Sequence, residues 1–158
     1  MSSAAHSGLA LAQLAAGNLR FCNCHIESAA LPRRLQMAAL LPDCLADIVV
    51  LGELPVSVEM LFDCGLAELN VLRLPGAAIE PETEAVLKQR VAAVSAPLLL
   101  VLAADDAHDT AVDLDTQLAK LQTLFADEIE TERLSVGSAR WNRRTGKVDI
   151  VVGGSDGE

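Results

Sequence analysis

The sequence is poor in the residues from which most metal and redox centres are built. It has three histidines and four cysteines, and no cysteine follows Cys64. Aromatic residues make up only 3% of the chain, so the core must consist mainly of leucine, valine, isoleucine and alanine. Four cysteines do not form the dense framework of a disulfide-stabilised secreted domain, and they predict reduced thiols in a cytoplasmic protein.

Long apolar runs and a basic surface are missing as well. No uninterrupted apolar segment reaches the roughly 18 residues that a membrane-spanning helix needs, and the N-terminus lacks the basic start and apolar block of a secretory signal. The formal net charge of −10 disfavours nucleic acids and anionic membranes as partners. These absences predict a soluble intracellular protein, and 158 residues predict a single domain.

Short apolar runs alternate with helical patterns along the chain, which predicts an α/β fold. The predicted strands are residues 48–51, 69–74, 98–102, 134–141 and 147–152. The predicted helices are residues 7–21, 32–41, 57–64, 81–95 and 112–132. We therefore expect a mainly parallel central sheet flanked by helices, with a C-terminal antiparallel hairpin strand. In this interpretation residues 1–45 form an N-terminal helical arm, residues 46–152 the α/β domain, and residues 153–158 a flexible, glycine-rich tail.

Four segments occur in an order and spacing that resemble one protein family. They are Gly17-Asn18-Leu19-Arg20-Phe21, residues 61–73, residues 96–103 and residues 137–148. Together these segments resemble the β-class carbonic anhydrases along almost the whole chain. The resemblance implies a β-carbonic-anhydrase-like fold, a tight dimer in which N-terminal helices wrap the partner, and sheets that join across the interface. It also implies a zinc ion, held by two cysteines and one histidine at the tips of the first and third strands, that makes hydroxide available to attack CO2.

The zinc-ligand positions of that family carry other residues here. The first strand ends in Leu51-Gly52, and one alignment then places Glu53 at the first cysteine. The ungapped alternative places Leu51 at the cysteine, Glu53 at the family aspartate and Pro55 at the family arginine. On the third strand, Ala104 stands at the histidine and Ala107 at the second cysteine. Alanine has no donor atom, so we expect zinc to be absent.

The positions that match the family best are those with a structural role. The retained residues are Asp63, Gly65, Arg73, Gly76 and Gly146. Gly146 lies in a turn between two predicted strands, where a glycine is expected to supply a positive φ angle. The pattern predicts that the framework persists while the ligands are lost.

Two other groups of residues could hold a metal. Glu53, Asp105, Asp106 and His108 lie near the carboxyl ends of predicted strands, and together they could bind zinc, magnesium or calcium. The simpler interpretation is that these are solvated loop residues. Cys22-x-Cys24-His25 resembles half a zinc site, whereas Cys44 and Cys64 stand alone; ordinary packing or surface positions are the simpler interpretation there too.

Three functions follow from these patterns. The favoured one is a catalytically inactive carbonic anhydrase relative, acting as a structural or regulatory subunit through homodimers or higher oligomers. Its partners would be an active carbonic anhydrase or a CO2-fixing complex. The alternative is a carbonic anhydrase, or another lyase or hydrolase, with a noncanonical metal site at Glu53, Asp105, Asp106 and His108. The third is a sensor that binds bicarbonate or another small anion near Arg73.

Overall fold

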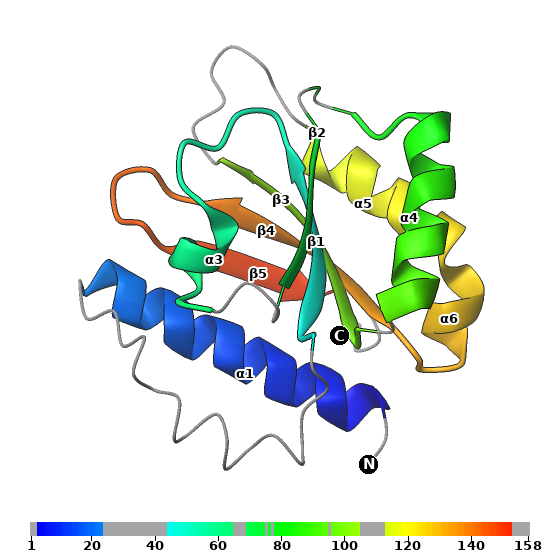
Figure 1. Cartoon of the computed structure of the whole chain (residues 1–158), viewed down its shortest axis with the longest axis horizontal. Coiled ribbons are helices and arrows are strands. Elements are labelled where there is room, and N and C mark those ends of the chain that lie inside the picture. Colours follow the sequence, from blue (N-terminus) through cyan, green and yellow to red (C-terminus); the bar gives the residue numbers. More distant parts are fainter. Residues whose placement is uncertain are drawn as a thin grey trace.

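The fold is a five-stranded mixed sheet with helices on both faces, seen in a computed structural model (Figure 1). The structure describes residues 3–23, 44–64, 69–74, 76, 78–94, 96–104 and 113–152. The strands are β1 (Ala46–Leu51), β2 (Leu69–Leu74), β3 (Leu98–Ala104), β4 (Ser135–Trp141) and β5 (Val148–Val152). The helices are α1 (Ser3–Cys22), α3 (Val58–Leu61), α4 (Pro81–Val94), α5 (Leu114–Leu124) and α6 (Ala126–Glu130).

The strand order confirms the predicted architecture. It is β2-β1-β3-β4-β5; the first four strands run parallel and β5 pairs antiparallel with β4. Gly146, in the turn before β5, has φ = 78°, as the turn pattern predicts. The parallel strands therefore present their carboxyl ends at one edge of the sheet, which is where α/β proteins usually form ligand sites.

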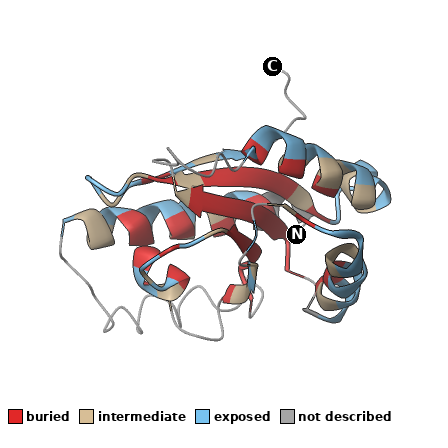
Figure 2. Ribbon diagram, turned by 90° about the horizontal axis from the view of Figure 1, so that it is seen from above, coloured by how far each residue is buried: buried red, intermediate tan, exposed pale blue. Residues whose placement is uncertain are grey.

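Apolar side chains cover both faces of the sheet, and this explains why the strands read as continuous apolar runs. On β1, Ile48 and Val50 join the core under α1 and α3, whereas Val49 and Leu51 join the core under α4, α5 and α6. β3 alternates in the same way. Figure 2 shows the buried sheet between helices whose outer surfaces are exposed.

Helix α1, the described part of the predicted arm, packs on the sheet of its own chain. Ala10 and Leu14 are fully buried in the core on that side. Ser7 Oγ donates a hydrogen bond to the carbonyl oxygen of Pro97 at 3.0 Å, just before β3. Contact of this helix with a partner chain stays a prediction, and the predicted helix at 32–41 and the tail at 153–158 lie outside the described residues.

Two predicted helices differ from the observed ones. The prediction of one long helix at 112–132 is wrong, because Phe125 adopts φ = −109° and ψ = 27° and separates α5 from α6. The break buries the Phe125 ring, and Lys88 Nζ donates to the carbonyl oxygen of Leu124 at 3.2 Å while it stands 5.1 Å from that ring. The helix at 57–64 ends early, at Leu61, and Asp63 takes a left-handed conformation with φ = 48°.

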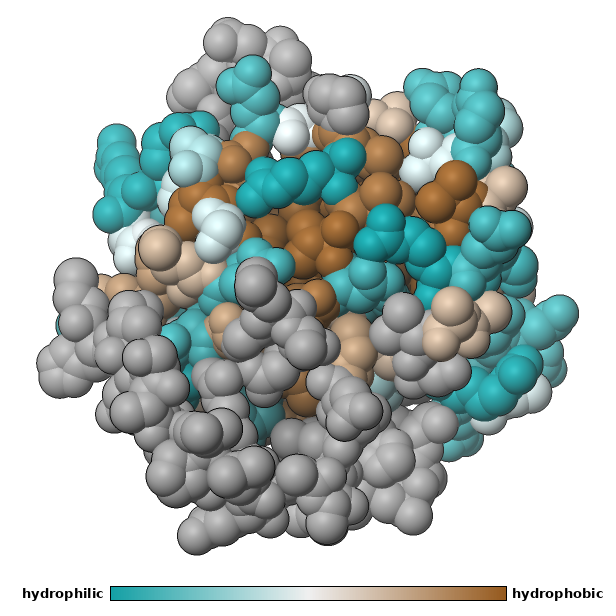
Figure 3. Space-filling view, in the orientation of Figure 1, coloured by the Kyte–Doolittle hydropathy of each residue, from teal (hydrophilic) through white to brown (hydrophobic). Residues whose placement is uncertain are grey.

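The two edge strands leave apolar side chains partly uncovered. Val71, Leu72 and Leu74 of β2 are half-buried, and Figure 3 shows apolar surface gathered near the centre of the face on which β1 and β2 lie. Val151 of the other edge strand, β5, is 63% exposed. Within the described residues, no helix combines the length and hydrophobicity that crossing a membrane would require.

Candidate functional site at the carboxyl edge of the sheet

The loop after β1 is fixed to the end of β2 by backbone hydrogen bonds. Gly52 has φ = 73°, a left-handed conformation that favours glycine. Its N–H group donates to the carbonyl oxygens of Leu74, at 3.1 Å, and Gly76, at 3.0 Å. Gly76 therefore contributes a backbone acceptor, and the two hydrogen bonds fix the direction in which the loop leaves the sheet.

Arg73 holds the same loop from the exposed side of β2. Its Nη1 donates to the carbonyl oxygen of Leu54 at 3.2 Å, and its Nη2 donates to that of Val56 at 3.1 Å. Because the planar guanidinium carries several donors in one plane, one arginine can bridge both carbonyls. Retention of Arg73 thus has a structural explanation in this chain.

A cavity of about 450 Å³ lies beside this loop. Its lining is Gly52, Glu53, Leu54, Pro55, Arg73, Leu74 and Arg143. The volume is within the usual range for small-molecule sites. Two arginines and one glutamate are among the lining residues, so charges of both signs border the cavity and positive charge prevails, which suits a carboxylate better than a cation.

Trp141 closes the neighbouring part of the same edge. It pairs in register with Ala104 at the tips of β4 and β3, and only 6% of its surface is exposed. The Arg143 guanidinium stands 5.5 Å from the centre of the indole ring, a cation–π contact. The buried indole Nε1 has no hydrogen-bond partner, which leaves one polar atom unsatisfied at this end of the sheet.

The structure brings together only some of the predicted site residues. Glu53 and Pro55 both line the cavity and are exposed, whereas Ala104 lies half-buried at the tip of β3. Asp105, Asp106, Ala107 and His108 lie outside the described residues, and so does the retained Gly65. Where the chain is described, no three histidine, cysteine, aspartate or glutamate side chains cluster in a way that could hold a metal ion.

The cysteines that the structure describes are thiols in partly or fully buried positions. Burial raises the pKa of Cys22, against a smaller lowering by Lys147. Burial also raises the pKa of Cys44, and the nearby Asp47 raises it further. Both shifts disfavour the thiolate that metal binding requires. Cys24 and His25, the other members of the predicted half-site, lie outside the described part of the chain.

Asn18 links three segments that are distant in the sequence, a role that sequence reasoning missed. Its Nδ2 donates to the carbonyl oxygens of Leu61, at 3.1 Å, and Gly146, at 3.0 Å. Its Oδ1 accepts the N–H of Val148 at 2.8 Å. Two signals were available: Asn18 is a polar residue four positions after Leu14, on the buried side of the helix, and it lies in the first segment of the family resemblance.

Two neighbours of Asn18 also attach α1 to the end of α3. Arg20 forms an ion pair of 2.6 Å with the buried Asp63, which explains why Asp63 is retained. Gly17 lies against the Phe62 backbone so closely that a Cβ atom would come within 1.7 Å of the Phe62 carbonyl oxygen. The first segment of the family resemblance is therefore a set of contacts that dock one helix.

A second polar cluster lies at the opposite, amino end of the sheet. Asp47 of β1 is 3% exposed, and its Oδ1 accepts a hydrogen bond from Asn70 Nδ2 while its Oδ2 has no partner. Arg90 of α4 donates to Asn70 Oδ1. Burial raises the pKa of Asp47, although the hydrogen bond from Asn70 and the charge of Arg90 oppose the shift.

Asp47 should make the protein less stable as the pH rises. A carboxyl group whose pKa is higher in the folded than in the unfolded state destabilises the fold when it is ionised, so the destabilisation is greatest above the folded pKa. It disappears as the pH falls to the unfolded pKa near 4, because the group is then protonated in the folded protein. We expect Asp47→Asn to raise the free energy of unfolding by about 1 kcal/mol at neutral pH and to equal the wild type near pH 4. Urea unfolding across this pH range, with the exposed Asp149→Asn as control, measures the difference. Parallel pH profiles for wild type and Asp47→Asn would contradict it.

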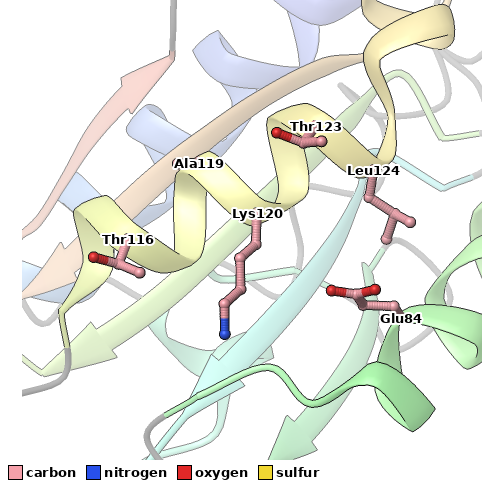
Figure 4. A pocket seen from close by; sticks show the side chains of 6 residues that line it. All are labelled: Glu84, Thr116, Ala119, Lys120, Thr123 and Leu124. Carbon is pink, nitrogen blue, oxygen red and sulfur yellow. The ribbon is translucent and has the colours of Figure 1, made fainter.

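A groove of about 420 Å³ between α4 and α5 is the other depression of note (Figure 4). Lys120 and Glu84 extend into it from the two helices. Lys120 Nζ donates to the Ile79 carbonyl oxygen at 3.1 Å, and Gln117 Oε1 accepts the Ile79 N–H at 2.8 Å. These α5 side chains hold the segment before α4, so the polar groups of the groove have a structural role.

Comparison with known proteins identifies the fold. No protein-family model matches the chain, and no curated protein matches its sequence. The carbonic anhydrase from Streptococcus mutans superposes with a TM-score of 0.52 at 14% identity, covering 77% of this chain and 94% of that chain. The β-carbonic anhydrase CcaA gives 0.53 at 13% identity, with coverage of 79% and 91%. The Coccomyxa β-carbonic anhydrase, solved with acetazolamide, gives 0.53 at 14% identity, with coverage of 80% and 82%. At such identities the similarity shows a β-carbonic-anhydrase-like fold, and the fold alone.

Proposed function

We propose that this chain is a noncatalytic protein with a β-carbonic-anhydrase-like fold, and that it acts as a structural or regulatory subunit through oligomerisation. The observation that carries the proposal is the chemistry of two strand tips. β1 ends at Leu51 and is followed by Gly52, while β3 ends in Ala103-Ala104. None of these four side chains has an atom that can coordinate a metal, and Glu53, the next residue after Gly52, is exposed.

The contacts of residues in the segments that resemble the family support the same proposal. Arg73, Asp63 and Asn18 are all engaged in holding loops and helices in place. Such contacts stabilise a fold whether or not it carries out a reaction. A protein that had kept only its framework would keep residues of this kind.

Exposed apolar side chains support the assembly part of the proposal. Leu19 is 61% exposed on α1, Met60 is 54% exposed on α3 and Val151 is 63% exposed on β5. The other edge of the sheet, β2, also carries half-buried apolar side chains. Burial of such side chains against a second copy would be favourable at about 25 cal/mol per Å² of apolar surface.

The catalytic part of the proposal is tested with protein purified after expression in zinc-supplemented medium. We expect far less than one zinc per chain by elemental analysis, and no acceleration of CO2 hydration above buffer in a stopped-flow assay. The Streptococcus mutans carbonic anhydrase serves as the active control. One tightly held zinc per chain together with CO2 hydration would overturn the proposal and establish the enzyme with a noncanonical metal site.

The assembly part needs a separate measurement. Sedimentation velocity over a wide range of protein concentrations is expected to show a dimer or larger species. A Leu19→Glu and Met60→Glu double variant is the matched test of whether these side chains are buried in the assembly, because both are exposed in the single chain. A monomer at every concentration would refute the assembly.

A further inference from the structure

The turn between β4 and β5 is a basic region on an otherwise acidic protein. Arg143, Arg144 and Lys147 occur within five residues, and all three are exposed. The chain as a whole has a formal net charge of −10, and acidic residues outnumber basic ones in the layer formed by α4, α5 and α6. Positive charge is therefore concentrated at one end of the hairpin.

Hydrogen bonds fix the conformation of this turn. The N–H of Gly146 donates to the Asn142 carbonyl oxygen at 2.7 Å, and the N–H of Asn142 donates to the Lys147 carbonyl oxygen at 2.8 Å. Asn142 Oδ1 accepts the N–H groups of Arg144, at 2.9 Å, and Thr145, at 3.2 Å. Asn18 then ties Gly146 to α1. These hydrogen bonds order the turn before any partner binds, so binding loses little free energy to ordering of the turn.

Arg143 connects the turn to the cavity at the carboxyl edge of the sheet. Its guanidinium stacks over the Trp141 ring at 5.5 Å and lines the cavity of about 450 Å³ together with Arg73. Arg73 keeps its position by donating to Leu54 and Val56. Two arginines, one on β2 and one in the turn after β4, therefore border one opening. Arginine is the side chain best suited to bind carboxylates through two parallel hydrogen bonds.

We propose that the basic turn, defined as Arg143, Arg144 and Lys147, docks an acidic segment of a partner protein. One aspartate or glutamate of that segment enters the cavity between Arg73 and Arg143, and neighbouring carboxylates contact Arg144 and Lys147. The inference rests on the proposed function, because a noncatalytic subunit acts through its partners. Charge complementarity favours a short acidic segment, because three basic side chains and one cavity match a few carboxylates, whereas a nucleic acid backbone is bound through a longer row of phosphate contacts.

Two carboxylates of this chain lie close to the docking surface. Lys147 Nζ is 3.6 Å from Asp149 Oδ1, in a pair that is exposed and therefore weak. Glu53 lines the cavity itself, so its charge opposes an incoming carboxylate. Removal of the Glu53 charge is expected to strengthen binding of the acidic segment. A variant at Glu53 should therefore change the affinity in the opposite direction to variants of the basic turn.

A fluorescein-labelled oligoglutamate peptide tests the proposal by fluorescence anisotropy with the full chain. At about 20 mM salt we expect saturable binding that weakens as salt rises, because these contacts are exposed and screened. The double variant Arg143→Gln with Arg144→Gln should bind about tenfold more weakly, as the loss of two charged contacts implies. Arg133 is an exposed arginine in the loop after α6, so Arg133→Gln controls for the loss of a positive charge elsewhere on the surface and should bind nearly like the wild type.

Several outcomes would overturn the proposal. No saturable binding at low salt would do so, as would equal affinities for the double variant and the Arg133→Gln control. Full displacement of the peptide by bicarbonate at constant ionic strength would identify a small free anion as the occupant instead. Zinc content and CO2 hydration are measured on the same preparation, so an active zinc enzyme that still binds the peptide through the basic turn would refute the proposed function and not this surface.

Discussion

Replacement of Gly17 by alanine is expected to lower the free energy of unfolding by about 3 kcal/mol or more. The added Cβ atom would lie 1.7 Å from the carbonyl oxygen of Phe62 and 2.6 Å from its carbonyl carbon. These are backbone atoms next to α3, so they cannot rotate away as the end of a flexible side chain would. Relief requires α1 to move away from α3, and that movement disrupts the contacts of Asn18 and Arg20 as well. Urea unfolding followed by circular dichroism measures the loss.

The same helix offers a matched control. Gly8 is exposed, and a Cβ atom built there meets nothing within 4 Å. Because alanine is the better helix former, Gly8→Ala is expected to raise the free energy of unfolding by about 0.5–1 kcal/mol. Opposite signs at two glycines of one helix would show that packing, and not helix propensity, decides the effect at Gly17. Equal effects of the two substitutions would contradict the close contact with α3.

Asn18→Ala is expected to lower the free energy of unfolding by about 3–5 kcal/mol. The substitution removes three hydrogen bonds and leaves the carbonyl oxygens of Leu61 and Gly146 and the N–H of Val148 without this partner. Buried polar groups that lose their partners cost far more than the net gain from an ordinary hydrogen bond. Because the three partners belong to α3, the hairpin turn and β5, hydrogen exchange should increase in all three regions.

A second asparagine near the end of α1 is the control for this prediction. Asn23 is exposed, and Asn23→Ala should change the free energy of unfolding by less than about 0.5 kcal/mol. Asn18→Asp keeps the acceptor for the N–H of Val148 and loses both donated hydrogen bonds, so its free energy of unfolding should also be lower than that of the wild type. A small effect of Asn18→Ala, comparable to that of Asn23→Ala, would show that Asn18 does not link these segments.

The expected size of both effects bears on why this part of the sequence resembles the β-class carbonic anhydrases. Gly17, Asn18 and Arg20 each contact the end of α3, and Asn18 also reaches the hairpin. Substitution at these positions would cost a large part of the roughly 5–15 kcal/mol that stabilises a typical domain. Stability is thus enough to account for these residues in this chain, and it neither requires nor excludes catalysis.

The architecture was largely predictable from local patterns. Strands buried on both faces must be apolar throughout, so residues 48–51 and 98–102 indicated a parallel sheet without any knowledge of the fold. Helix α4 was equally clear from Pro81 and the acids of its first turn. The break at Phe125 was not predictable, because the residues on both sides of it follow one helical pattern.

The sequence by itself determined the fold class, the apolar residues Leu51 and Ala104 at two strand tips and the concentration of basic residues at 143–147, because each depends on residues adjacent in the chain. Tertiary structure alone decided which distant residues meet. Arg73 and Arg143 share a cavity, Asn18 bonds to Gly146, and Asp47 is buried with one oxygen unpartnered. Periodicity along the sequence indicates which face of a helix or strand is buried. The order of the strands in the sheet decides which other residues that face contacts and which strand ends lie side by side.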